Sequence, residues 1–222
     1  MSAAPPDDLR PDDLPYDAVA ASQALARADP ALGDVIARVG PPVIRYRPAE
    51  TFDALLRSVV YQQLSGKAAA TIHGRVLAAF GDPADPAAIA AAPDDALRAC
   101  GLSRAKAAAL RDLAGRRLDG SLPDRPALAQ MPDADVVEAL TAVRGVGRWT
   151  AEMVLMFTLG RPDVWPTGDL GVREGHRIVS GAAERPTPRE LEAAGERYRP
   201  WRSVAAWYLW RAVDLHRAGG AG

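Results

Sequence analysis

One carboxylate in this sequence stands where its charge could take part in a reaction. Asp169 lies in the loop from Pro166 to Leu170, and a helical pattern follows it. Backbone amides and the helix dipole stabilise a negative charge at a helix start. Such a carboxylate can stabilise a cation that develops beside it and can orient a water molecule for attack. Capping the helix is the alternative role for Asp169, and it is a common one for aspartates in such loops.

A pair of glycines upstream of this loop marks a sharp turn. Gly145 and Gly147 flank Val146, between a helical apolar pattern that ends at Val143 and another that begins at Ala151. Each glycine inside a helix costs about 1 kcal/mol relative to alanine, so we expect a turn between two helices with Val146 packed inward. The first amides of the second helix have no helical partner, and a phosphate can approach a glycine backbone closely. A plain helix-turn-helix corner in a core is the alternative.

Four stretches resemble the helix-hairpin-helix DNA glycosylases, and most of all the alkylation-repair branch, 3-methyladenine DNA glycosylase II. They are the glycine hairpin, the run GRWTA at 147–151, the loop VWPTGDLGV at 164–172 and the segment PWRSVAAWYLW at 200–210, in the family's order. The resemblance covers roughly Thr51 to Ala218. It implies an all-α, two-lobed fold with the active site in the cleft between the lobes. One departure is that the chain lacks the sizeable N-terminal β-containing domain of the best-known members.

The resemblance assigns functions to particular residues. It implies that the hairpin amides hold a DNA phosphate and that Asp169 is the catalytic residue facing the extruded nucleotide. The implied hairpin contacts to DNA are Gly145, Val146, Gly147, Arg148 and Thr150. Alkylation at a ring nitrogen makes a purine cationic, so electron-rich side chains can select it by cation–π stacking. The implied substrate-pocket residues are Trp149, Trp210, Tyr61 and Met153.

The end of the helix that begins at Thr51 is the other implied contact with the duplex. In the family, a residue at this place fills the gap that a flipped nucleotide leaves in the stack. Gln63 best matches that wedge position, with Gln62 and Leu64 within reach. A glutamine can fill the space and hydrogen-bond the estranged partner base. The alternative is that these amides only cap neighbouring backbone groups.

The residue that follows the hairpin's Gly-Arg pair separates two classes of these enzymes. Bifunctional members carry a lysine there, whose amine attacks the sugar and forms a Schiff base that leads to strand cleavage. This chain has Trp149 instead, and its only lysines are Lys67 and Lys106, far from the hairpin in sequence. We therefore expect a monofunctional enzyme in which Asp169 stabilises the sugar cation and water hydrolyses the N-glycosidic bond.

The cysteine and histidine content predicts no metal and no cofactor. Cys100 is the single cysteine, and three histidines accompany it. One thiol cannot form an internal disulfide, and it cannot replace the four cysteines with which the iron–sulfur branch of the family holds its cluster. A structural metal site is therefore not expected.

The net charge of −1 is unusual for a protein that binds nucleic acid, where a basic footprint is the expected signal. The deficit is local, since residues 1–20 hold five aspartates and one arginine, a net charge of −4, and the other 202 residues carry +3. Basic residues recur in two stretches, 104–117 and 197–202, where a DNA groove could use them. On charge alone, a solvated helix face is the better interpretation of both stretches.

The 222 residues fit one globular protein, which we divide into three parts. An acidic flexible tail is expected at 1–15, a helical lobe carrying Asp169 at 16–50 plus 162–222, and a helical lobe containing the hairpin at 51–161. Helices are expected at 17–28, 30–40, 51–62, 66–80, 86–91, 94–100, 104–118, on both sides of the hairpin, after Asp169, at 187–198 and near the C-terminal end. Prolines at 123, 126 and 132 are expected to interrupt the chain before the hairpin's first helix.

With this resemblance, the sequence predicts a monofunctional DNA base-excision repair glycosylase. It would flip alkylated bases, 3-methyladenine and 7-methylguanine among them, out of double-stranded DNA, hydrolyse the N-glycosidic bond and leave an abasic site. No cofactor or membrane is expected to take part, and the protein is expected to be a monomer. The absence of a signal-peptide pattern at the N-terminus favours the cytoplasm. The alternative is a non-catalytic helix-hairpin-helix module that binds damaged or bent DNA.

Overall fold

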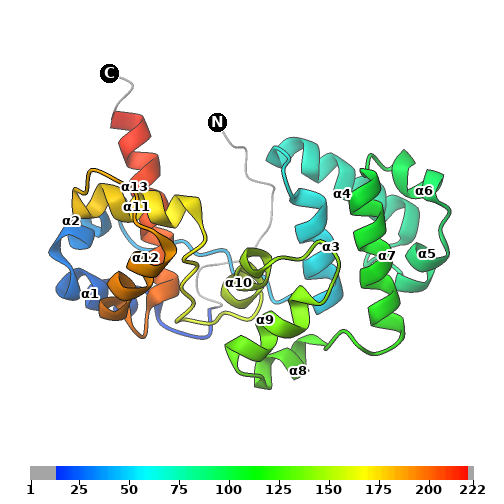
Figure 1. The fold of residues 1–222 in the computed structure, drawn as a ribbon, viewed down its shortest axis with the longest axis horizontal. Helices are drawn as coiled ribbons and strands as arrows, with labels where there is room; N and C mark the ends of the chain where they lie inside the picture. Colours follow the sequence, from blue (N-terminus) through cyan, green and yellow to red (C-terminus); the bar gives the residue numbers. More distant parts are fainter. Residues whose placement is uncertain (1–13, 220–222) are drawn as a thin grey trace. The chain divides into compact units, whose positions relative to one another are not determined.

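The computed structural model describes residues 14–219 of the chain (Figure 1). Every regular element in that range is a helix, which confirms the predicted all-α fold. No helix in it is long and apolar enough to cross a membrane. The residues divide into two compact units, the first comprising 48–154 and the second comprising 14–47 together with 155–219. Most of the tail predicted at 1–15 lies outside the described residues.

The first unit consists of helices α3 to α9 and the first turns of α10. Their bounds are α3 (Thr51–Tyr61), α4 (Gly66–Phe80), α5 (Pro86–Ala91), α6 (Asp94–Ala99), α7 (Arg104–Leu118), α8 (Arg125–Gln130), α9 (Asp133–Thr141) and α10 (Arg148–Phe157). Serine hydroxyls cap two of these helices. Ser65 accepts a hydrogen bond from the amide of Ala68 at the start of α4, and Ser103 accepts one from the amide of Lys106 at the start of α7.

Helix α7 is the scaffold of the first unit. It packs against α3, α5 and α6. Ala107, Leu110, Leu113 and Ala114 on its inner face are at most 4% exposed. Because two of these side chains are alanines, the neighbouring segments can approach the α7 backbone closely. The polar side chains of the same helix then reach those segments directly, as described below for the hairpin.

Helix α8 is not predicted from the sequence, where the prolines of this region suggest interruptions. Asp124 caps α8 by accepting a hydrogen bond from the amide of Ala127 at 2.8 Å, and Pro126 stands in its first turn. The amides of a first helical turn have no helical partner, so a proline there removes no hydrogen bond. Pro126 therefore begins a helix at this point instead of ending one.

The second unit is formed by both ends of the described chain. It contains α1 (Ala18–Ala28), α2 (Pro30–Val39), α11 (Leu170–Ser180), α12 (Pro188–Gly195), the 3-10 helix η2 (Glu196–Tyr198) and α13 (Arg202–Gly219). A capping box begins α12, where Thr187 and Glu190 bond each other's backbone amides. Helix α13 packs against α1, α2 and α11, and its residues 202–209 are buried.

Helices α11 and α13 lie side by side at close distance (Figure 1). Gly175 of α11 rests against the backbone of Leu209, where a Cβ atom would collide with the carbonyl. A Cβ atom at Gly171 would lie 2.8 Å from the ring of Trp210. These two glycines therefore allow the first turn of α11, which follows Asp169, to approach the tryptophan.

Candidate active site and nucleic-acid interface

The predicted glycine hairpin is present between α9 and α10. Gly145 has a φ of 79°, a left-handed conformation that favours glycine, and a Cβ atom there would lie 3.3 Å from the Cβ of Ala109 on α7. Val146 is 5% exposed, which confirms that it packs inward. Gly147 has no atom within 4 Å of where its Cβ would be, so its backbone faces open space. The turn therefore packs against α7 at Gly145 and leaves the backbone accessible at Gly147.

Two polar side chains from other segments hold the hairpin, and neither contact is predicted from the sequence. The Asp112 carboxylate of α7 accepts a hydrogen bond from the amide of Arg144 at 2.8 Å. Gln62 donates its side-chain amide to the carbonyl of Gly145 at 3.0 Å. Burial raises the pKa of Asp112, but the bonds from the Arg144 amide and from Arg116 outweigh it and leave the pKa below its ordinary value. Asp112 is therefore held as a carboxylate, which is the stronger acceptor for the turn.

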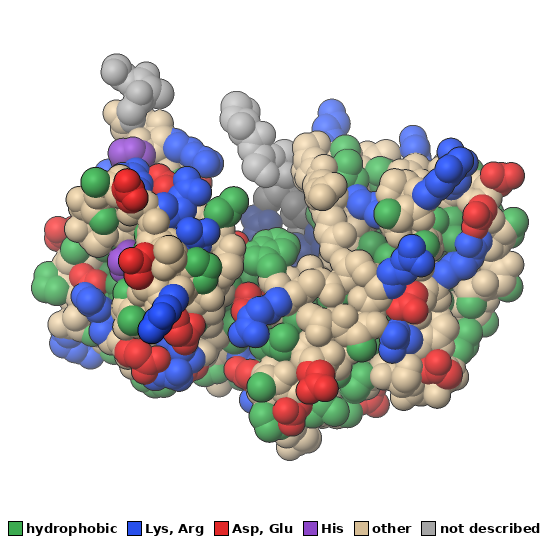
Figure 2. Space-filling view, in the orientation of Figure 1, with side chains coloured by type: hydrophobic (Ala, Val, Ile, Leu, Met, Phe, Trp, Pro, Cys, Tyr) green, Lys and Arg blue, Asp and Glu red, His purple; other side chains and the backbone are tan. Residues whose placement is uncertain are grey.

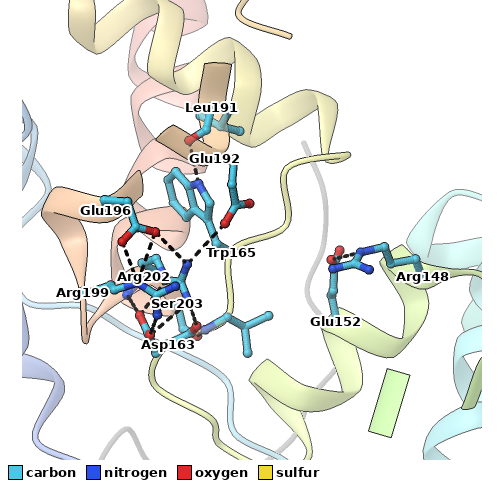
Figure 3. A network of polar contacts seen from close by, with 11 residues as sticks. Arg148, Glu152, Asp163, Trp165, Leu191, Glu192, Glu196, Arg199, Arg202 and Ser203 are labelled. Atoms are coloured by element: carbon cyan, nitrogen blue, oxygen red, sulfur yellow. Dashed lines mark hydrogen bonds and ion pairs between the residues drawn. The ribbon is translucent and has the colours of Figure 1, made fainter. Parts of the chain in front are cut away.

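The side chains at the start of α10 differ in exposure. The side chain of Arg148 is 75% exposed, and its Nε donates to the Glu152 carboxylate at 2.9 Å (Figure 3). Glu152 itself is 4% exposed, so the pair is anchored in the interior and directs a guanidinium to the surface. Thr150 is only 5% exposed and lies in the wall of a cavity. Of the predicted hairpin contacts, Arg148 is thus the one that presents a charged side chain to solvent.

A cavity of about 500 Å³ opens in the first unit between the end of α3 and the start of α10. Its volume is in the range of small-molecule sites, roughly 300–1,000 Å³. It brings together three of the four predicted pocket residues, Tyr61, Trp149 and Met153. The fourth, Trp210, belongs to the second unit. The other lining residues are Arg57, Ser58, Gln62, Gln63 and Thr150.

Arg57 is a pocket residue that the sequence analysis misses. Its guanidinium carbon lies 4.2 Å from the centre of the Tyr61 ring, and His73 forms a T-shaped pair with the same ring, with centroids 6.1 Å apart. The Tyr61 ring therefore has a cation–π contact with Arg57 within the protein. Trp149 is 49% exposed and is the pocket aromatic with the larger surface available to a ligand.

The turn after α3 has the features expected of a strained functional loop. Gln63 has a φ of 57°, and among the described residues it is the only one other than glycine with a positive φ. A left-handed conformation costs a residue with a side chain about 1–2 kcal/mol. Gln63 and Leu64 are both exposed, Leu64 by 39%, whereas the Gln62 amide is engaged by Gly145. Of the three predicted wedge residues, Gln63 is the one that combines a left-handed backbone conformation with an exposed side chain.

Asp169 lies in the second unit, where it caps α11. Its Oδ1 atom accepts two hydrogen bonds, from the amide of Val172 at 2.7 Å and from the indole nitrogen of Trp210 at 2.9 Å. The Trp210 ring stacks on Phe157, with centroids 6.1 Å apart and an angle of 29° between the planes. Asp169 is thus an N-cap, as the alternative interpretation proposed, but its orientation is also fixed by a tryptophan from another helix.

All three arginines of the basic stretch at 197–202 are paired with carboxylates of the protein, and two arginines of the stretch at 104–117 are paired as well. The pairs are Arg111–Asp94, Arg116–Asp112, Arg197–Asp29, Arg199–Asp163 and Arg202–Asp163, the last two drawn in Figure 3. Figure 2 shows acidic and basic side chains interspersed on the viewed face of each unit. A cation that is already paired displaces fewer counterions from DNA. The paired surface fits the interpretation of solvated faces better than that of a basic footprint.

Comparison with known proteins places the chain in a family. Residues 56–200 match the HhH-GPD superfamily of base excision DNA repair proteins. The chain belongs to this superfamily. It is 35% identical over 178 residues to DNA-3-methyladenine glycosylase 1 of Schizosaccharomyces pombe, a match that covers 77% of this chain and 78% of that protein.

Two solved structures are similar over most of the chain. One is the Schizosaccharomyces pombe 3-methyladenine DNA glycosylase Mag1 in complex with abasic DNA, with a TM-score of 0.77, 32% identity and coverage of 86% of this chain and 95% of that one. The other is a DNA-3-methyladenine glycosidase from Bacillus halodurans, with a TM-score of 0.80, 34% identity and coverage of 89% and 91%. The resemblance drawn from the four sequence stretches is confirmed.

The hairpin geometry makes a prediction about DNA affinity. We expect Gly145→Val to weaken binding to methylated and unmodified duplexes by the same factor, about tenfold, because a side chain in the left-handed conformation costs about 1–2 kcal/mol and would shift the hairpin away from the geometry in which its amides meet a phosphate. The added atoms would also press on Ala109. A phosphate contact carries no information on base identity, so the loss should not depend on the lesion. Fluorescence anisotropy with the two duplexes measures both affinities.

Gly120→Val is the matched control for this experiment. Gly120 has a φ of 78° in the turn after α7, and its Cβ would meet nothing within 4 Å. The variant therefore introduces the same backbone strain away from the hairpin and should bind DNA like the parent. An equal loss of affinity in both variants, or parental affinity in Gly145→Val, would contradict the hairpin's role.

Proposed function

We propose that this protein is a monofunctional DNA glycosylase that hydrolyses the N-glycosidic bond of alkylated bases in double-stranded DNA and leaves an abasic site. The substrates that we propose are 3-methyladenine, 7-methylguanine and related lesions. Membership of the superfamily and the names of the similar proteins support this class of reaction. The observation that carries it is the carboxylate of Asp169, which two donors hold through one oxygen. One chain supplies every residue that the proposal uses, so we propose a monomer.

The proposed reaction uses the charge of Asp169. As the bond between the sugar C1′ and the base nitrogen breaks, its electron pair leaves with the base and positive charge develops on the sugar. A fixed carboxylate stabilises that charge and orients a water molecule, whose oxygen bonds to C1′ while its proton passes to the carboxylate or to solvent. An alkylated purine is cationic while it is attached to the sugar, so it leaves as a neutral base without a general acid.

We assign recognition of the flipped base to the cavity of the first unit. Trp149 offers an exposed indole, and cation–π stacking favours a positively charged purine over a neutral one. Met153 adds a polarisable side chain to the wall. The Arg57 guanidinium stacks on Tyr61 in the wall of the cavity, and its N–H groups can donate to acceptor atoms of a base or a phosphate. Hairpin amides would hold the DNA backbone while Gln63 fills the vacated position.

The role of Asp169 gives the test of this proposal. Asp169→Asn is nearly isosteric and can still cap α11, because asparagine is also a good N-cap. We expect it to bind DNA like the parent and to release methylated bases about 10²–10³-fold more slowly, since it lacks the charge that stabilises the sugar cation. The measurement is single-turnover incubation with methylated duplex, followed by identification of the free bases by mass spectrometry.

Asp124→Asn is the matched control, because Asp124 caps α8 by the same kind of hydrogen bond. It should release bases at the parental rate. Asp169→Asn with near-parental activity would refute the catalytic assignment. A parent protein that binds damaged duplex and releases no base would instead support the non-catalytic binding module.

The absence of lyase activity is a separate prediction. Trp149 stands where bifunctional members carry their lysine, and Lys106 is occupied by the carbonyls of Val60 and Gln62. Without an amine at the sugar, no Schiff base forms. We expect the abasic strand to remain intact until alkali is added. Denaturing gel electrophoresis measures the intact and cleaved strands. A covalent protein–DNA adduct after treatment with borohydride would show that an amine does attack.

A further inference from the structure

Lys106 makes an unusual pair of contacts at the end of α3. Its Nζ atom donates to the carbonyl of Val60 at 2.8 Å and to the carbonyl of Gln62 at 2.7 Å. The residue is half-buried in the first turn of α7, and burial lowers the pKa of its ammonium group. Lys106 is one of only two lysines in the chain. Its ammonium group is thus bonded to the backbone of the protein itself.

These contacts answer a structural need of the turn after α3. The last carbonyls of a helix have no amide partner within the helix and carry the negative end of its dipole. Helix α3 ends at Tyr61, and the chain enters the left-handed conformation at Gln63. A cation that bonds the carbonyls on both sides of Tyr61 offsets this charge and fixes the direction in which the chain leaves the helix.

Gln62 connects the same turn to the hairpin. Its carbonyl accepts from Lys106, and its side-chain amide donates to the carbonyl of Gly145. Gln62 is therefore bonded to α7 through its backbone and to the hairpin through its side chain. Asp112, on the same α7 helix, bonds the hairpin through the amide of Arg144. Helix α7 thus fixes the position of both predicted DNA contacts of the first unit.

We propose that Lys106 is a positioning residue that holds the turn carrying Gln63 in the conformation that enters the DNA stack and that, through Gln62, keeps this turn in register with the hairpin. The inference rests on the proposed function for the wedge role of Gln63. It gives Gln62 a different task from that of Gln63, although the two residues are adjacent and chemically identical. Gln62 braces the turn, and Gln63 fills the gap.

The test measures insertion of the wedge residue into the DNA stack in a duplex from which no base can be released. A duplex carries a tetrahydrofuran abasic analogue with 2-aminopurine opposite it, and the fluorescence of 2-aminopurine rises when its stacking is disturbed. The parent should raise the fluorescence at saturation, and Gln63→Ala should lose most of this rise. Lys106→Met keeps the aliphatic stem and removes both donated hydrogen bonds. We expect it to lose the rise as Gln63→Ala does and to bind this duplex about tenfold more weakly, in line with hydrogen bonds from a charged group.

Three further proteins make the result specific to Lys106. Lys67→Met removes the other lysine, which is exposed in the first turn of α4, and should behave like the parent. Lys106→Arg restores a cation with several donors and should recover the fluorescence rise. Gln62→Met cuts the bond to Gly145 without touching Lys106, and it should reduce the rise even if Lys106→Met proves too unstable to study.

The outcomes separate this inference from the proposed function. A parental fluorescence rise in folded Lys106→Met or in Gln62→Met, an equal loss in Lys67→Met, or the absence of any rise with the parent would each overturn the inference. Loss in Lys106→Met with recovery in Lys106→Arg would support it. Release of bases from methylated DNA by the parent reports on the proposed function independently, because the tetrahydrofuran duplex offers no bond to cleave.

Discussion

The close packing of α11 against α13 is the constraint on which the catalytic proposal depends. Gly175 and Gly171 provide it, the first against the backbone of Leu209 and the second against the ring of Trp210. Because the two helices are this close, the indole nitrogen of Trp210 can donate to Asp169 at 2.9 Å. A carboxylate on a loop would otherwise sample several orientations. Electrostatic stabilisation of a transition state requires a charge that is already oriented before the reaction begins.

In the first unit, helix α7 fixes the positions of segments that we assign to the site, as the packing of α11 against α13 does for Asp169 in the second. The small side chain of Ala109 lies beside Gly145 of the hairpin, and polar side chains of α7 bond the two segments that we assign to DNA. Asp112 holds the hairpin through the Arg144 amide, and Lys106 holds the turn at the end of α3. Neither residue is assigned a contact with DNA. The two segments that we assign to DNA are therefore short turns with a residue in the left-handed conformation, and each is bonded by a charged side chain from the same helix.

Local features of this structure could be predicted from the sequence, and long-range contacts could not. Helical caps, the hairpin turn and the buried Val146 follow from residue types within a few positions of one another. The place of Asp169 at the start of a helix also follows from the pattern of its loop. Its bond to Trp210 joins residues 41 positions apart, and the contacts of Asp112 and Gln62 with the hairpin span 32 and 83 positions. Periodicity shows which face of a helix is apolar, but it does not show which polar side chain of another helix meets it.

The claim that an oriented charge at Asp169 stabilises a sugar cation can be tested by binding alone. The measurement compares two otherwise identical duplexes, one with a neutral tetrahydrofuran and one with a cationic pyrrolidine in place of the damaged nucleotide. A site complementary to the transition state should bind the cationic duplex at least about tenfold more tightly. We predict this preference for the parent protein and its loss in Asp169→Asn. Equal affinity of the parent for both duplexes, or a preference that survives in Asp169→Asn, would contradict the account.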